Sequence, residues 1–283
     1  MSARRSPSSG LARRSRRLSD QETRDRMLQA AIAMINRTGL TVSLDHIGFE
    51  DLIREAGVSR STAYRHWPYK DLFFSDLVKE LATTAGPPIL RGELALIRQV
   101  LAEHPGRLET AELRHRLLLE LIRRLALLDF QEVSTSPGWR TYLALHATVS
   151  GLADDGLRAE IQAALAQSDA AHTARVAQAW QQVTTLFGYR LRPELATTFE
   201  ALATLVDATL RGLVITALSS PETAAHTASA QPFGTPDRAE WSLPALGVAS
   251  LAMSFLEPDP AVEWTADRPA EIHRLLDAWK PEE

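Results

Sequence analysis

Apolar side chains recur every three to four residues along most of the chain, and this helical period limits the fold more than any other feature. The first clear run covers residues 20–38, where Met27, Ala31 and Ile35 share one helix face. No stretch alternates apolar and polar residues with the period of two that is typical of a half-buried strand. The sequence therefore predicts an all-α fold.

Capping and breaking residues divide the N-terminal part of the chain into four expected helices. Ser19 and Glu22 have the S-x-x-E spacing of a capping box, in which each side chain satisfies a backbone N–H at a helix start. Glycine favours the left-handed conformation that ends a helix, and proline cannot continue one. The resulting helices are expected over 20–38 (ended by Gly39), 49–56 (ended by Gly57), 59–66 (ended by Pro68) and 70–81.

Gly86, Pro87 and Pro88 predict a domain junction, because two prolines remove backbone donors that a helix needs. The chain is then expected to consist of an Arg-rich disordered arm (1–18), a small helical domain (19–84) and a larger helical domain (85–283). Residues 219–237 are rich in small and polar residues and are expected to be a mobile loop. Helices of the larger domain are expected near 90–104, 109–130, 137–152, 157–187, 193–218, 243–256 and 269–279.

The charge is distributed unevenly along the 283 residues. Residues 1–80 hold 14 Lys and Arg against 10 Asp and Glu, whereas residues 81–283 hold 17 against 25. Six arginines precede the first acidic residue, Asp20. They are either part of a solvated, disordered arm or a tail that neutralises phosphates beside a nucleic-acid-binding body. These residues are Arg4, Arg5, Arg13, Arg14, Arg16 and Arg17.

The composition is that of a soluble globular protein, with 45% hydrophobic and 23% charged residues. The longest uncharged and largely apolar run, residues 241–256, contains Pro244 and is shorter than the about 20 residues needed to cross a bilayer. No secretory signal follows the basic N-terminus, and the absence of cysteine excludes disulfides. We therefore expect a cytoplasmic protein without a membrane span.

Residues 49–66 have the plan of a helix-turn-helix, in which the second helix enters the DNA major groove. Gly57 permits the tight turn, Val58 can fill the small core between the helices, and Ser59 can cap the second helix. Tyr64 and His66 have an alternative interpretation as packed core residues. The polar residues expected on the exposed face of the second helix are Arg60, Ser61, Thr62, Tyr64, Arg65 and His66.

The run from Ala56 to Leu72, AGVSRSTAYRHWPYKDL, resembles the A-G-V-S-x-x-T-x-Y-x-H-F-x-x-K-x-x-L signature of tetracycline-repressor-like (TetR) transcriptional regulators. The resemblance covers about residues 20–81. It departs from the signature at Trp67, where the family usually has Phe, and the segment from Gly39 to Gly57 is about four residues longer than usual.

The resemblance implies that Arg60, Ser61, Thr62 and Tyr64 face bases and phosphates, and that His66 and Lys70 contact the DNA backbone. Arg60 suits a bidentate contact to guanine, and Lys70 lies near a helix N-terminus, whose dipole favours anions. The arm arginines Arg13, Arg14, Arg16 and Arg17 are candidates for the adjacent minor groove.

The resemblance also implies a homodimer on a palindromic operator of double-stranded DNA, and a larger domain that senses an unknown small-molecule effector. Residues 193–218 and 243–256 are the candidate dimer helices, and Asp207 and Arg211 have the spacing of an ion pair on the first of them. Candidate pocket residues, each of which can equally be core, are Trp139, Tyr142, His146, Trp180, Thr184 and Phe187. The expected function is that of a repressor which the effector releases from DNA.

Two other classes of function fit the sequence less well. An all-α enzyme is disfavoured, because the sequence has no G-x-S-x-G, G-x-G-x-x-G or H-E-x-x-H motif, and we expect no cofactor and no metal site. A DNA-packaging protein that binds without sequence preference would explain the arm, but it would not need a large acidic domain.

Overall fold

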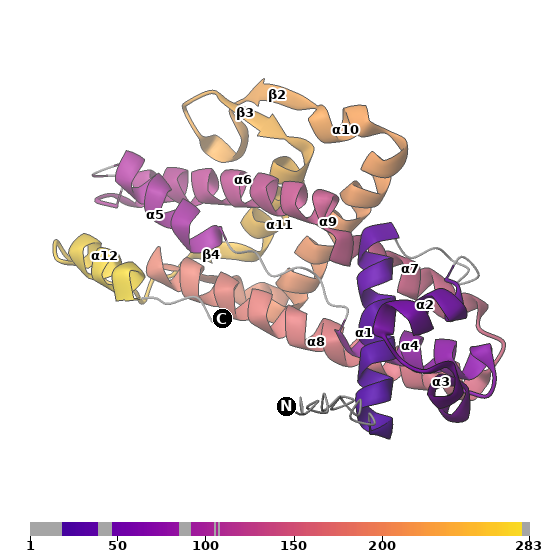
Figure 1. The fold of residues 1–283 in the computed structure, drawn as a ribbon. Helices are drawn as coiled ribbons and strands as arrows, with labels where there is room; N and C mark the ends of the chain where they lie inside the picture. The colour runs from indigo at the N-terminus through magenta and orange to yellow at the C-terminus, as the bar shows by residue number, and fades with distance from the viewer. Residues whose placement is uncertain (1–18, 39–46, 85–91, 105, 107, 279–283) are drawn as a thin grey trace, which may run out of the picture. The chain divides into compact units, whose positions relative to one another are not determined.

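The computed structural model describes residues 19–38, 47–84, 92–104, 106 and 108–278. The chain divides into two compact units, residues 1–80 and residues 81–283. Helices dominate both units (Figure 1), so the prediction of an all-α fold is confirmed. The expected junction at Gly86 to Pro88 and the Arg-rich arm lie outside the described residues.

The four helices predicted for the N-terminal part are α1 (Asp20–Thr38), α2 (Phe49–Ala56), α3 (Arg60–His66) and α4 (Lys70–Thr84), of which the last four residues belong to unit 2. The capping box before α1 is confirmed, because Ser19 N–H donates to Glu22 Oε2 at 2.8 Å and Glu22 N–H donates to Ser19 Oγ at 3.0 Å. The candidate cap Gly39 lies outside the described residues.

An aromatic cluster forms the centre of unit 1. The ring centroids of Phe49 and Phe73 are 5.2 Å apart, and those of Trp67 and Phe73 are 5.0 Å apart. All three side chains are buried, and burying each contributes about 2 to 3 kcal/mol. Trp67 Nε1–H donates to Asp76 at 3.1 Å, so the larger ring at the signature's Phe position is accommodated with its polar atom satisfied. This core holds α2 and α3 in place.

Unit 2 is built from helices α5 (Glu93–Glu103), α6 (Ala111–Thr135), α7 (Pro137–Gly151), α8 (Asp155–Leu186), α9 (Phe199–Ser219), α10 (Pro221–Ala225), α11 (Leu243–Phe255) and α12 (Arg268–Ala278). Helix α6 packs against α5, α9 and α11, and α8 packs against α7 and α9. Polar side chains cap five of these helices by accepting a backbone N–H. They are Thr110, Ser136, Asp154, Thr198 and Ser242.

Two short antiparallel ribbons join these helices. Strand β1 (Tyr189–Leu191) pairs with β4 (Leu256–Pro258), and β2 (Thr227–Ala230) pairs with β3 (Ala239–Ser242). The expectation of a loop over 219–237 is wrong, because this segment contains α10, β2 and a 3₁₀ turn (Pro232–Gly234). Strands of only three or four residues are too short to show a period of two.

Helix α9 begins at Phe199, later than the start at residue 193 that the sequence predicted. A 3₁₀ turn occupies Pro193–Leu195, Ala196 then adopts a left-handed conformation with φ of 43°, and Thr198 caps the helix. A left-handed residue cannot lie inside a right-handed helix, so α9 begins at Phe199.

Helix α9 is long and apolar enough to cross a membrane by length and composition alone. It carries Asp207 and Arg211 at its centre, where they pair with each other at 3.4 Å, as predicted. It also packs against α6, α8 and α11, as a core helix does. Gly247 of α11 permits a close approach, since an added Cβ there would lie 3.0 Å from Thr209. These contacts identify α9 as the central helix of unit 2.

Candidate nucleic-acid interface and ligand cavity

The turn between α2 and α3 has the geometry of a helix-turn-helix. Gly57 has φ of 63° and ψ of 32°, a left-handed conformation that favours glycine. Val58 is buried, and Ser59 Oγ accepts the backbone N–H of Thr62 at 3.2 Å to start α3. The residues predicted from the sequence for the turn, the plug and the cap therefore occupy these positions.

Arg60 projects from α3 with 72% of its side chain exposed. Its Nη2 lies 2.8 Å from Glu50 Oε1, and the hydroxyl of Tyr64 donates to the same oxygen at 2.8 Å. The Arg60 guanidinium also lies 5.6 Å from the centroid of the Tyr64 ring. Tyr64 is 37% exposed and packs against Phe49 in an edge-to-face arrangement, so it lies at the border of the core.

Glu50 is the residue of this face that sequence reasoning missed. It precedes Arg60 by ten residues on another helix, so no local pattern joins the two. An exposed ion pair of this kind contributes only about 0 to 1 kcal/mol, so a phosphate or base can displace Glu50 from Arg60 at small cost. The acidic side chain nevertheless competes for the cation that is the best candidate for reading a base.

The other predicted contact residues lie on α3 and at the start of α4. Ser61 Oγ and Thr62 Oγ1 lie 3.2 and 2.6 Å from Ser59 Oγ, at the start of α3. Arg65 is exposed and pairs with Asp20 at 2.8 Å. His66 is half-buried, with its ring 4.4 Å from Trp67, and Lys70 is the first residue of α4. The arm residues Arg13, Arg14, Arg16 and Arg17 lie outside the described residues.

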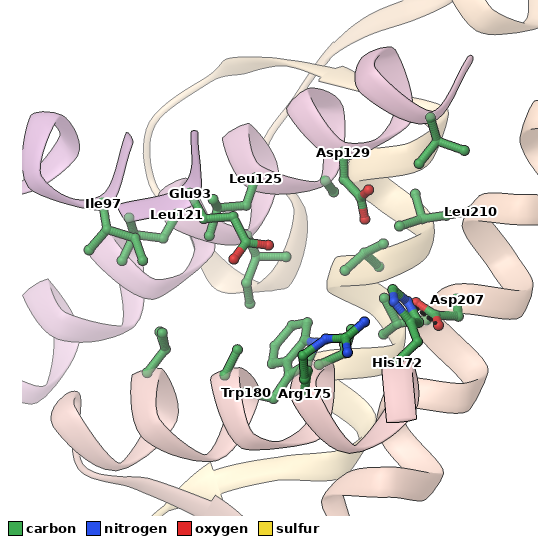
Figure 2. A pocket seen from close by; sticks show the side chains of 18 of the residues that line it. Glu93, Ile97, Leu121, Leu125, Asp129, His172, Arg175, Trp180, Asp207 and Leu210 are labelled. Atoms are coloured by element: carbon green, nitrogen blue, oxygen red, sulfur yellow. Dashed lines mark ion pairs between the residues drawn. The ribbon is translucent and has the colours of Figure 1, made fainter. Parts of the chain in front are cut away.

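Unit 2 contains a cavity of about 210 Å³ between α5, α6, α8 and α9 (Figure 2). Most of its wall is aliphatic, and it also presents two tryptophans and six titratable side chains. The residues that line it are Glu93, Ile97, Leu118, Leu121, Ile122, Leu125, Ala126, Asp129, Val133, Trp139, His172, Arg175, Val176, Ala179, Trp180, Val183, Val206, Asp207, Leu210, Arg211 and Val248.

Of the candidate pocket residues, Trp139 and Trp180 line this cavity. His146 instead borders a separate hollow with Asp169. Thr184 is buried and donates its hydroxyl to the Trp180 carbonyl at 2.7 Å, and Phe187 is buried in the core. The sixth candidate, Tyr142, is buried next to Trp139, on which its ring stacks at 5.2 Å.

A polar network joins α7, α8 and α9 beside the cavity. Tyr142 donates its hydroxyl to Asp169 at 2.6 Å and accepts from Arg211 Nη1 at 2.8 Å. Burial and the bond to Asp169 raise the pKa of Tyr142, and the bond to Asp169 raises the pKa of His146. His172 Nε2 lies 2.9 Å from Asp207 Oδ2, which Arg211 also contacts. These charges neutralise one another within the wall.

Glu93 and Asp129 also line the cavity but lie outside that network. The pKa of Glu93 is raised to about 7, mainly because the carboxyl is buried and to a smaller extent because Glu132 is a nearby negative charge. The pKa of Asp129 is also raised to about 7, mainly by burial and to a smaller extent by the negative charges of Asp207 and Glu93. Sequence reasoning missed both residues. Asp129 carried a usable signal, because it is a single acidic residue inside the apolar run from Leu125 to Phe130.

Unit 1 thus holds a helix-turn-helix, and unit 2 is a larger helical unit with a cavity. Several solved structures that align with the chain are TetR-family transcriptional regulators. One from Mesorhizobium loti aligns at 17% identity over 84% of this chain and 98% of that chain, with a TM-score of 0.44. One from Streptomyces coelicolor aligns at 18% identity over 83% and 96%, with a TM-score of 0.39.

Another is SmeT, described as the repressor of a multidrug efflux pump of Stenotrophomonas maltophilia. Its triclosan complex aligns at 17% identity over 86% of this chain and 96% of that chain, with a TM-score of 0.39. The sequence matches no family model and no curated protein. Likeness at this level concerns the arrangement of helices and assigns no function to the chain.

Proposed function

We propose that this chain is a TetR-like transcriptional regulator that binds a palindromic DNA operator as a homodimer and is released from it by a small molecule. The observation that carries this proposal is the exposed polar face of α3 behind the left-handed Gly57 turn. It lies within the signature-like run from Ala56 to Leu72. The cavity in unit 2 supplies a place for the effector.

In this proposal α3 enters the major groove. Arg60 leaves Glu50 and makes a bidentate contact to guanine, which is worth about 1 to 3 kcal/mol of discrimination. Ser61, Thr62, Tyr64 and Arg65 supply neighbouring contacts. His66 and Lys70 hold the phosphate backbone and fix the register of α3 without reading sequence. Arg13, Arg14, Arg16 and Arg17 add contacts to the adjacent minor groove.

The exposed face of α9 supports a dimer. Leu205, Ile215 and Leu218 are 42, 50 and 66% exposed in the single chain, and Ala208 and Gly212 lie between them on the same face. An apolar stripe with small residues at its centre suits close packing against a second copy. A two-fold pair of α3 helices would then read half-sites about 34 to 36 Å apart.

The proposal places the protein in the cytoplasm, as a binding protein without catalytic activity. A packaging protein without sequence preference is the second candidate function, and the arm arginines are the feature that favours it. The two differ in one measurable quantity, which is the ratio of specific to non-specific affinity at physiological salt.

Selection of bound duplexes from a random DNA library tests the proposal. We expect a palindromic winner that binds about a thousandfold more tightly than scrambled DNA. Arg60→Ala should then weaken binding at one base pair of each half-site by about 1 to 3 kcal/mol. Arg37→Ala is the matched control, because Arg37 is also exposed and ion-paired, with Glu55 at 2.6 Å, but lies on α1. Selection without enrichment would refute a sequence-specific regulator.

A further inference from the structure

Two carboxylates that line the cavity have no cationic partner among the described residues. Glu93 on α5 and Asp129 on α6 form no hydrogen bond or ion pair with any residue in the part of the chain that the structure describes. The third lining carboxylate, Asp207, is already paired with His172 and Arg211. Figure 2 shows the carboxylate ends of Glu93 and Asp129 directed toward α8, on the opposite wall. The cavity therefore offers two free anionic acceptors.

These carboxylates lie in an unfavourable environment when they are ionised. Burial raises the pKa of each to about 7, and their own repulsion adds to the shift of Asp129. A ligand that carries positive charge would offset both effects, whereas a neutral ligand would leave them in place. The titratable groups that face the pair are Glu132 on α6, His172 and Arg175 on α8, and Asp207 and Arg211 on α9.

The cationic side chains of the cavity wall do not neutralise Glu93 and Asp129. Arg211 is engaged by Asp207 and by Asp169, at 3.4 and 3.6 Å. Arg175 lines the cavity but is exposed to solvent, where water screens its charge. His172 is paired with Asp207. The half-buried carboxylates therefore outnumber the cationic side chains that are available inside the cavity.

The rest of the wall suits the apolar body of an organic cation. Trp180 lines the cavity, and the face of a tryptophan ring attracts cations. Trp139 is 2% exposed, and its Nε1–H has no acceptor among the described residues. The volume of about 210 Å³ is smaller than the about 300 to 1,000 Å³ of sites for drug-sized compounds. The cavity thus fits a compound with one small ring system.

We propose that the cavity binds a small organic cation, with its ammonium group between Glu93 and Asp129 and its apolar part against Trp180. The identification of this cation as the effector rests on the proposed function. Its binding to the cavity does not depend on DNA, so the two proposals can fail separately.

Three probes of similar size that differ in charge test the inference. These are 2-phenylethylammonium, 2-phenylethanol and 3-phenylpropanoate, and their binding to the full chain is measured by calorimetry at pH 8 and pH 5. We expect the ammonium to bind at least tenfold more tightly than the alcohol at pH 8. This preference should shrink at pH 5, where Glu93 and Asp129 are protonated while a primary ammonium stays charged. Equal or weaker binding of the ammonium, or no binding of it at millimolar concentration, would overturn the inference.

Variants locate the site. Glu93→Gln and Asp129→Asn should each reduce the preference for the ammonium at pH 8 at least fivefold, and Asp129→Glu should retain most of it. The matched control is Glu112→Gln, because Glu112 also lies on α6 but pairs with Arg116 at 2.6 Å outside the cavity. Thermal unfolding checks that each variant is folded. An equal loss in Glu112→Gln would indicate attraction by overall charge and would overturn the assignment of this site.

A DNA gel shift separates the two proposals. If the chain binds the selected operator but the ammonium binds no better than the alcohol, the inference is wrong and the proposed function stands. If the ammonium binds through Glu93 and Asp129 but no operator is selected, the proposed function is wrong and the cation site stands.

Discussion

Replacing Asp129 by asparagine should stabilise the protein at alkaline pH and leave its stability nearly unchanged at acid pH. Asp129 has a folded-state pKa of about 7 against an ordinary value of 3.8. Between these values the unfolded chain releases the proton that the folded chain keeps, so stability falls as pH rises through this window. Asparagine cannot ionise and therefore avoids this loss.

The size of the effect follows from the shift. About three pKa units at about 1.4 kcal/mol each correspond to about 4 kcal/mol. Part of the Asp129 side chain reaches solvent, which lowers the expected gain at pH 8 to about 2 to 4 kcal/mol. At pH 4 the folded carboxyl is protonated and the unfolded one is only about half ionised, so little of the loss has developed and the difference between variant and wild type should be small.

Urea unfolding at pH 4, 6 and 8, followed by tryptophan fluorescence, measures this difference. Five of the six tryptophans belong to residues 81–283, so the signal reports mainly on unit 2. Asp155→Asn is the control, because Asp155 has 89% of its side chain exposed. Protein concentration is kept constant, since dimer formation would change the apparent stability. A variant that is less stable at pH 8, or a gain that does not depend on pH, would refute the reasoning.

Three further predictions concern DNA binding and assembly. Gly57→Ala should cost about 1 kcal/mol, measured by thermal unfolding, because φ of 63° is unfavourable for alanine although its Cβ would meet no atom within 4 Å. An unchanged melting temperature would argue against strain. Glu50→Gln should tighten operator binding up to about fivefold in fluorescence anisotropy, because it weakens the competitor of Arg60; unchanged affinity would contradict this competition. Ile215→Asp should give a monomer in light scattering and abolish tight binding to the palindrome, whereas a dimeric variant would place the interface elsewhere.

Local signals in the sequence were sufficient for unit 1. The bounds of α1 and α2 agree with the prediction, because Ser19, Glu22 and Gly57 act on residues within one helical turn of themselves. In the larger unit Asp154 caps α8, which begins at Asp155, two residues before the predicted start at 157. The β2–β3 ribbon was missed because its strands are short and are stabilised by each other, which no local pattern expresses.

The sites were predictable to different degrees. The exposed polar face of α3 follows from its period and its cap, so the exposure of Arg60 was predicted. Its pairing with Glu50 depends on how α2 packs against α3, and the cavity depends on how four helices meet. Tyr142 and His146 were expected at a cavity because aromatic and polar residues are common there, but Asp169, distant in sequence, binds both.

The length of α8 has a mechanical consequence. At 1.5 Å per residue its 32 residues span about 48 Å, and the cavity residues His172 to Val183 all lie in its C-terminal half. Its N-terminal half, which includes Ile161 and Leu165, packs next to α7. A straight rod of this length that pivots by about 5° at one end moves its other end by about 4 Å. If α8 turns as a rigid rod about its C-terminal end, a shift smaller than one atom at the cavity would become a displacement of atomic size at Asp155.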